Sequence, residues 1–235
     1  MKVKLFADGA VISEMVDCYN NGTVQGFTTN PTLMRQAGIE DYESFAKEAL
    51  EKIPDAPISF EVFSDDFPDM HRQALKLNEL ASNVYVKIPI TNTKGESSLP
   101  LVQSLVLHGV KVNVTAIMTA NQVRDLAPVL SAGVPSVVSV FAGRIADSLR
   151  DPEPIMRECR LHLSYYKLEH KAELLWASCR EVYNIKQADD CGCQIVTVSP
   201  SILKKLKLKG KDLKEYSLET VQMFYDDASQ AGYKL

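Results

Sequence analysis

Short apolar runs rich in β-branched residues recur along the chain, and most are separated by segments whose apolar residues repeat at helical spacing. Segments 65–82 and 119–133 are of the second kind and predict helices. Regular alternation of strands and helices predicts a parallel sheet. Eight such units favour a closed (β/α)8 barrel, and the open-sheet alternative is weakened because no glycine-rich phosphate fingerprint follows any run. The predicted strands are residues 2–8, 24–29, 58–63, 83–90, 111–117, 136–142, 173–178 and 194–199.

Two segments after the sixth strand add to this pattern. Residues 145–170 predict a loop followed by a helix, and residues 217–231 predict one more helix with Ser217 at its start. That last helix lies beyond the eighth unit, where it would cover the barrel mouth or bind a neighbouring subunit. A length of 235 residues suits one domain. We therefore expect an α/β fold, a (β/α)8 TIM barrel over residues 1–235 with an extra C-terminal helix.

Composition and charge exclude several classes of protein. The apolar fraction is 46% and the charged fraction 24%, as in ordinary globular proteins. The net charge is −4 with interspersed signs, so we expect no nucleic-acid partner, and we interpret the basic run 204–214 as a solvated helix end and loop. The N-terminal residues MKVKLFADGA contain no apolar leader, and no stretch approaches the about 20 apolar residues of a membrane span. These features predict a cytoplasmic protein with no membrane partner.

The cysteines predict neither disulfides nor a metal site. There are five of them, an odd number without paired zinc-ligand spacing, so we expect reduced thiols. The pair Cys191 and Cys193 is only a weak metal signal without a second ligand cluster. We expect no metal and no other cofactor.

Polar side chains are concentrated where the predicted strands end. In a (β/α)8 barrel the reacting groups lie at the C-terminal ends of the strands, so these residues are the candidates for chemistry. In strand order they are Asp8; Thr28, Thr29 and Asn30; Glu61; Lys87; Asn113 and Thr115; Ser139 and Arg144; Ser178 and Arg180.

Lys87 is the most informative of these candidates. It stands between Val86 and Ile88 in a predicted strand that a parallel barrel covers on both faces, so its amine should be desolvated. Burial drives a lysine toward its neutral form unless it finds a partner, and a neutral amine attacks carbonyl groups to form a Schiff base. The alternative is a structural ion pair with Glu61 inside the barrel. The residues alone leave both possibilities open.

The other candidates also have structural alternatives. Asp8 either caps the first helix or exchanges protons with a substrate. Asn30, followed by Pro31, has the pattern of a helix N-cap. Arg144 and Arg180 either pair with helix carboxylates or hold a phosphate dianion through charge-assisted hydrogen bonds.

Six segments resemble one known family. They are GFTTNPTLM, SFEVFSDD, VYVKIPIT, KVNVTAIMTANQ, SVFAGRIAD and LLWASCR, and they fall on the second to seventh predicted strands in the family's order. The chain resembles the transaldolases and their relatives the fructose-6-phosphate aldolases, which are Schiff-base (β/α)8 barrels.

The resemblance implies a role for each candidate. Lys87 would form the Schiff base, Asp8 would be the acid/base for the hydroxyl cleaved in the retro-aldol step, and Glu61 with Thr115 would hold a proton-shuttling water. Asn30, Asn113 and Ser139 would bind the dihydroxyacetone part, with Thr28 and Thr29 packing and bonding around Asn30, while Arg144, Ser178 and Arg180 would hold the phosphate. The implied substrate site therefore comprises Thr29, Asn30, Asn113, Ser139, Phe141, Arg144, Ser178 and Arg180.

The two branches of the family differ at two positions. The resemblance associates Phe and Glu with the transferases where the aldolases carry Tyr and Gln, and this chain has Phe141 and Glu61. The short length is that of the aldolase branch, Ala142 departs from the transferases' FVGR, and Gly9 stands where Ser or Thr often follows the aspartate.

We therefore expect a transaldolase of the pentose phosphate pathway. It would transfer a dihydroxyacetone unit from sedoheptulose 7-phosphate or fructose 6-phosphate to glyceraldehyde 3-phosphate or erythrose 4-phosphate. The alternatives are an aldolase that releases free dihydroxyacetone and a non-catalytic barrel that binds sugar phosphates. The expected partners are sugar phosphates and further copies of the chain in a homo-oligomer.

Overall fold

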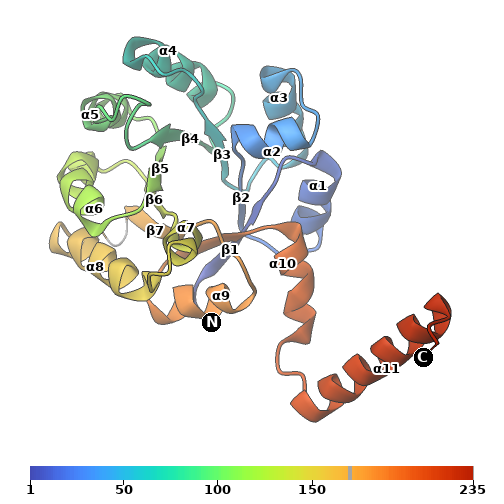
Figure 1. Ribbon diagram of the computed structural model, residues 1–235. Helices are drawn as coiled ribbons and strands as arrows, with labels where there is room; N and C mark the ends of the chain where they lie inside the picture. Colours follow the sequence, from blue (N-terminus) through green and yellow to red (C-terminus); the bar gives the residue numbers. More distant parts are fainter. Residues whose placement is uncertain (169–170, 235) are drawn as a thin grey trace. The chain divides into compact units, whose positions relative to one another are not determined.

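Eight parallel strands form a closed barrel in the computed structural model, which describes residues 1–168 and 171–234 (Figure 1). Each strand pairs with its neighbours in chain order, and β8 returns to pair with β1. The predicted (β/α)8 fold is confirmed, and each strand falls within its predicted run except β7, which begins one residue earlier, at Ala172. The strands are β1 (Lys4–Asp8), β2 (Gly26–Thr28), β3 (Ile58–Glu61), β4 (Val84–Pro89), β5 (Val112–Ile117), β6 (Ser136–Val140), β7 (Ala172–Trp176) and β8 (Ile195–Val198).

Helices alternate with these strands and surround the barrel (Figure 1). Side-chain caps define several of their starts, because Asn30, Asp41 and Asp66 each accept a hydrogen bond from a backbone N–H of the first turn. The helices of this part are α1 (Ile12–Asn20), α2 (Pro31–Gln36), α3 (Tyr42–Lys52), α4 (Phe67–Asn78), α5 (Leu99–Leu107), α6 (Ala120–Leu126), α7 (Ala142–Asp147), α8 (Pro152–Tyr165), α9 (Tyr183–Asp190) and α10 (Pro200–Lys205).

Two predicted helical segments differ from the structure. The helix predicted over 119–133 ends at Leu126 and continues as the 3-10 helix η1 (Ala127–Ala132), because Pro128 has no N–H to continue the α-helical hydrogen bonds. The predicted loop from residue 145 is wrong at its start, since Ile145 lies inside α7. The helix that follows is α8, and residues 169–170 at the end of the predicted segment lie outside the described residues.

Residues Lys204–Leu235 form a second compact unit, separate from Met1–Leu203. It contains the end of α10, the 3-10 helix η2 (Leu206–Leu208) and α11 (Leu213–Ala231). The predicted start of α11 at Ser217 was wrong: the helix begins four residues earlier, at Leu213, because the Asp212 carboxylate caps it by accepting from the backbone N–H groups of Lys214 and Glu215. None of the helices among the described residues is long and apolar enough to cross a membrane.

The barrel interior has an apolar layer with a polar layer above it. Phe6, Val137, Leu175 and Ile195 come from four strands and form one buried cluster. Strands β1 and β6 are not neighbours in the sheet, so the cluster lies inside the barrel. Side chains two positions apart share a face of a strand. The residues two positions further toward the C-terminal strand ends are Asp8, Ser139, Ala177 and Thr197.

The turn between β6 and α7 packs tightly on the end of β7. The Gly143 N–H donates to the Ala177 carbonyl at 3.3 Å, and a Cβ on Gly143 would lie 1.6 Å from the Ser178 carbonyl oxygen. Ser178 itself adopts a left-handed backbone with φ of 64°. Only glycine permits this approach, which brings Arg144 and Ser178 to the same end of the barrel.

We expect Gly143→Ala to lower the free energy of unfolding by about 1–3 kcal/mol, because the two backbone segments must separate to admit the methyl group. Urea unfolding measures the effect. Gly9→Ala is the matched control, since no heavy atom lies within 4 Å of a Cβ at that position. Equal stabilities of the two variants would contradict the proposed packing.

Candidate active site

Lys87 projects from the middle of the barrel with its amine buried. Its side chain is 6% exposed, and its Nζ lies 3.0 Å from Glu61 Oε2 and donates to the Thr29 carbonyl at 2.8 Å. The predicted burial is confirmed, and the ion pair with Glu61 that the sequence suggested is present. These two contacts hold the amine in one position at the C-terminal end of β4.

Asp8 faces the same space from β1. Its Oδ1 accepts a hydrogen bond from Thr28 Oγ1 at 2.7 Å. The alternative role as a helix cap is wrong, because the residue at the N-cap of α1 is Val11. Burial raises the pKa of the Asp8 carboxyl above its ordinary value, whereas the Lys87 charge and the Thr28 hydrogen bond partly lower it. This carboxyl therefore takes up a proton at a higher pH than an exposed aspartate.

A cavity of about 110 Å³ lies at this end of the barrel. It brings together eight of the twelve predicted site residues and leaves out Thr29, Glu61, Asn113 and Arg180. The lining residues are Asp8, Thr28, Asn30, Lys87, Thr115, Ser139, Phe141, Arg144, Ala177, Ser178 and Thr197.

Three of the four omitted residues lie behind the cavity wall. Glu61 reaches the cavity through its ion pair, and the Thr29 carbonyl accepts from the same amine. Asn113 joins two hydroxyls across the barrel, since its Nδ2 donates to Ser59 Oγ at 2.9 Å and its Oδ1 accepts from Ser139 Oγ at 2.7 Å. They therefore orient groups that line the cavity.

Two lining residues have polar groups suited to a ligand. Thr115 Oγ1 is buried without a hydrogen-bond partner in the described part of the chain, an arrangement that a bound water or substrate would satisfy. Asn30 caps α2 by accepting from the Leu33 N–H at 3.0 Å, which fixes its side chain at the cavity wall. Its amide nitrogen is not used by the cap.

The two predicted phosphate-binding arginines differ in their surroundings. Arg144 lies with its guanidinium carbon 5.5 Å from the Phe141 ring centroid and lines the cavity. Arg180 lies outside it, because its Nε donates to Asp147 Oδ1 at 2.9 Å in an exposed ion pair. The Asp147 carboxylate therefore already neutralises much of the Arg180 charge.

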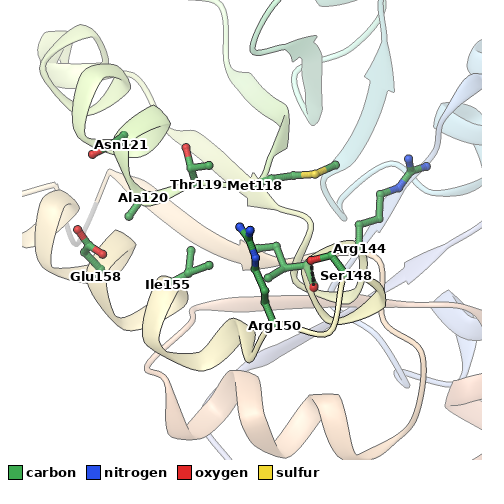
Figure 2. Close-up of a pocket in the computed structure, with 10 residues that line it drawn as sticks. Met118, Thr119, Ala120, Asn121, Arg144, Ser148, Arg150, Ile155 and Glu158 are labelled. Atoms are coloured by element: carbon green, nitrogen blue, oxygen red, sulfur yellow. Dashed lines mark hydrogen bonds between the residues drawn. The ribbon is translucent and has the colours of Figure 1, made fainter.

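Arg144 also lines a second cavity, of about 330 Å³, between α6, α7 and α8. Figure 2 shows the side chains of Arg144 and Arg150 extending in different directions at this cavity. Arg144 therefore lines both cavities.

Two residues of the cavity wall, Ala177 and Thr197, were not among the candidates, and Thr28 was expected only to pack and bond around Asn30. All three line the cavity. Thr197 lies in β8, whose residues were not considered as candidates. Its place two positions after the buried Ile195, at the end of a predicted strand, is the signal that identifies it.

These features define a (β/α)8 barrel with a buried lysine amine and two carboxyl groups at its C-terminal end. The profile of the family described as Transaldolase/Fructose-6-phosphate aldolase matches residues 5–235. The chain belongs to this family.

Proteins named "Probable transaldolase" are similar to this chain over most of their length. One from Thermoanaerobacter sp. (strain X514) is 34% identical over 233 residues, which cover 99% of this chain and 100% of the relative. Another, from Chelativorans sp. (strain BNC1), is 35% identical over 204 residues, which cover 87% of this chain and 88% of the relative.

We expect Asp8→Asn to raise the free energy of unfolding at neutral pH. The folded pKa of Asp8 is raised above 3.8, so the stability that this carboxyl contributes is present at low pH and lost as the pH rises through the folded pKa. Asparagine keeps an acceptor for Thr28 without the charge. The stability difference, variant minus wild type, should therefore grow from about pH 4 upward by about 1.4 kcal/mol per unit of pKa displacement.

Urea unfolding from about pH 4 to about pH 8 measures this difference. Asp41→Asn is the control of opposite sign, because hydrogen bonds from Ser44 lower the pKa of that exposed carboxyl. A uniform loss of stability in Asp8→Asn at every pH would show that burial does not dominate at Asp8.

Proposed function

We propose that this protein is a transaldolase that works through a Schiff base on Lys87. It transfers a dihydroxyacetone unit from sedoheptulose 7-phosphate or fructose 6-phosphate to glyceraldehyde 3-phosphate or erythrose 4-phosphate. The observation that carries the proposal is the buried Lys87 amine, which lines a small polar cavity between the carboxyl groups of Asp8 and Glu61.

The lysine supplies the electron sink. Its neutral amine attacks the ketose carbonyl to give a carbinolamine, and loss of water gives an iminium ion that accepts the electron pair when the C–C bond breaks. The amine must lose a proton before it attacks, and Glu61 Oε2 is the acceptor at 3.0 Å. Thr115, whose hydroxyl lacks a partner, would hold the water that carries protons during dehydration.

Asp8 is the proposed acid/base for the substrate. It accepts the proton of the hydroxyl that becomes an aldehyde during cleavage and returns it when the acceptor aldehyde is attacked. Burial raises the pKa of this carboxyl, so the protonated form that the return step needs is accessible at higher pH than in an exposed aspartate.

The remaining wall residues are the proposed substrate contacts. Asn30 and Ser139 offer an amide and a hydroxyl to the dihydroxyacetone part, with Asn113 orienting Ser139. The longer phosphate-bearing part extends past Arg144 and Ser178, since the inner cavity of about 110 Å³ is small. Arg180 is the proposed third phosphate contact, through nitrogen not engaged by Asp147.

Transfer is favoured over release by Phe141. After cleavage the dihydroxyacetone unit stays on Lys87 as an enamine, and release requires a proton donor and water. The phenyl ring of Phe141 lines the cavity and offers neither. The relatives named as probable transaldolases agree with this assignment.

A product assay on the wild-type protein tests the proposed transaldolase function. With fructose 6-phosphate as donor and erythrose 4-phosphate as acceptor, transfer should exceed release of free dihydroxyacetone. If release of dihydroxyacetone dominates, the protein is an aldolase. If neither product forms, the remaining alternative is a non-catalytic barrel that binds sugar phosphates. The cytoplasmic location, the pathway, the single domain and the homo-oligomer stay predictions.

We expect both Lys87→Arg and Lys87→Met to abolish turnover of fructose 6-phosphate. Arginine keeps a cation to pair with Glu61 but stays protonated and forms no Schiff base. Methionine removes the charge and keeps a similar length. The two variants together separate chemistry from the ion pair.

Steady-state kinetics and circular dichroism check this expectation. If Lys87 served only as a structural cation, Lys87→Arg would retain substantial activity while Lys87→Met lost it with the fold. Activity in a folded Lys87→Met would also overturn the Schiff-base assignment.

We expect Arg144→Ala to raise KM for fructose 6-phosphate about 10- to 150-fold, because a charge-assisted phosphate contact contributes about 1.5–3 kcal/mol. KM for free dihydroxyacetone should stay unchanged. The double substitution Arg180→Ala with Asp147→Asn is the comparison, since it removes the exposed ion pair without changing net charge, and it should raise KM less than Arg144→Ala because Asp147 already engages most of the guanidinium. A larger rise in that double variant than in Arg144→Ala would make Arg180 the main phosphate ligand.

A further inference from the structure

Two buried threonine hydroxyls, one on β8 and one on β2, form a chain of hydrogen bonds that ends at the Asp8 carboxylate on β1. Thr28 Oγ1 lies 2.7 Å from Asp8 Oδ1 and 2.6 Å from Thr197 Oγ1. Thr28 is 3% exposed and Thr197 is 4% exposed, so both hydroxyls depend on partners within the protein. Within the part of the chain that the structure describes, Thr197 makes no direct hydrogen bond to the Asp8 carboxylate.

The closure of the barrel creates this chain of hydrogen bonds. Asp8 is the register partner of Thr28 on β2, whereas Thr197 on β8 is the register partner of Phe6. Strand β1 therefore lies between the two threonines, and their hydroxyls meet inside the barrel. The arrangement needs β8 paired with β1.

The direction of the hydrogen bonds follows from the chemistry of the groups. An ionised carboxylate only accepts, so the single Thr28 hydroxyl proton is donated to Asp8. The short contact between the two threonines then requires Thr197 to donate to Thr28. Each donated bond polarises the next one, so the second hydroxyl strengthens the first bond to the carboxylate.

We propose that Thr197 is a positioning residue that acts through Thr28 to orient and stabilise the ionised Asp8 carboxylate. The inference rests on the proposed function, in which ionised Asp8 accepts a proton from the substrate. When the carboxyl gains that proton, both hydroxyls can reverse, because each one both donates and accepts. The pair thus follows the protonation state of Asp8 without changing its own charge.

The charged surroundings of Asp8 make this contribution measurable. Lys87 on β4 favours the ionised carboxylate, and Glu61 on β3 and Cys179 after β7 are the other titratable groups that interact with it. Burial raises the pKa of the Asp8 carboxyl, and burial raises the pKa of the Cys179 thiol to about 12, so this thiol stays uncharged at neutral pH. The hydroxyl pair and Lys87 therefore lower the pKa of the Asp8 carboxyl, whereas burial raises it.

The pH dependence of kcat/KM for transfer tests the proposal in a double-mutant cycle. Thr28→Val removes the direct hydrogen bond to the Asp8 carboxylate. It should move the acid limb of the pH profile upward by about 1 pH unit, because losing a hydrogen bond to the charged form of a group raises its pKa by about that much. Thr197→Val should move it upward by a few tenths of a unit, the share of a polarising neighbour. Thr197→Ser keeps the hydroxyl and should restore the wild-type limb.

The cycle separates an effect through Thr28 from an independent one. In the Thr28→Val background, Thr197→Val should add no further shift. Ser136→Ala is the control for losing a buried hydroxyl, because Ser136 lies at the opposite end of the barrel on β6 and should leave the limb unchanged. Equal shifts by Thr197→Val in both backgrounds, or no shift in the wild-type background, would overturn the proposal.

Borohydride trapping distinguishes this failure from failure of the proposed function. Wild type and Thr197→Val should both be trapped by fructose 6-phosphate, since the substitution does not touch Lys87. A wild-type protein that cannot be trapped refutes the Schiff-base function itself. Trapping of both proteins with coincident acid limbs refutes only the role of Thr197.

Discussion

The burial of one amine is the constraint on which the rest of the site depends. A lysine side chain that is 6% exposed cannot stay charged without partners, and this one finds them in Glu61 at 3.0 Å and in the Thr29 carbonyl at 2.8 Å. A parallel barrel makes this burial unavoidable, because helices cover the strands outside and side chains fill the inside. The ion pair and the chemistry are therefore not rival explanations, since the pair holds the amine where a carbonyl can reach it.

An apolar layer of side chains lies beneath this site inside the barrel. The apolar cluster of Phe6, Val137, Leu175 and Ile195 fills the interior beneath the polar layer. Most polar groups of that layer satisfy one another across strands, as Asn113 does with Ser59 and Ser139. Among the described residues Thr115 Oγ1 has no such partner, and a hydroxyl without one in the cavity wall is available to a ligand.

The sequence predicted the barrel and most of the cavity wall because both follow from short-range patterns. Strand-helix alternation needs only neighbouring residues, and the polar strand ends are visible once the strands are placed. Contacts between distant side chains are not visible in this way. The residues alone left Arg180 with either a helix carboxylate or a phosphate as partner, and only the structure identifies the carboxylate as that of Asp147 in α7, 33 residues earlier.

The predicted helix boundaries were wrong where a single residue had more influence than the pattern of apolar residues. The Asp212 cap starts α11 before Ser217, and Pro128 ends the α-helical geometry of the segment begun by α6. Thr197 was missed for a different reason, since its importance comes from a hydrogen bond to Thr28 that exists only when β8 closes on β1.

Mass spectrometry of the borohydride-treated protein tests the central claim most directly. The protein is incubated with fructose 6-phosphate, reduced, digested and mapped peptide by peptide, with an unreduced sample and a sample without sugar in parallel. A Schiff base on Lys87 predicts the mass of one reduced dihydroxyacetone unit on the peptide that contains Lys87, and only in the reduced sample that contained fructose 6-phosphate. A protein that turns over fructose 6-phosphate yet carries no adduct on Lys87, or carries it on another lysine, would contradict the account.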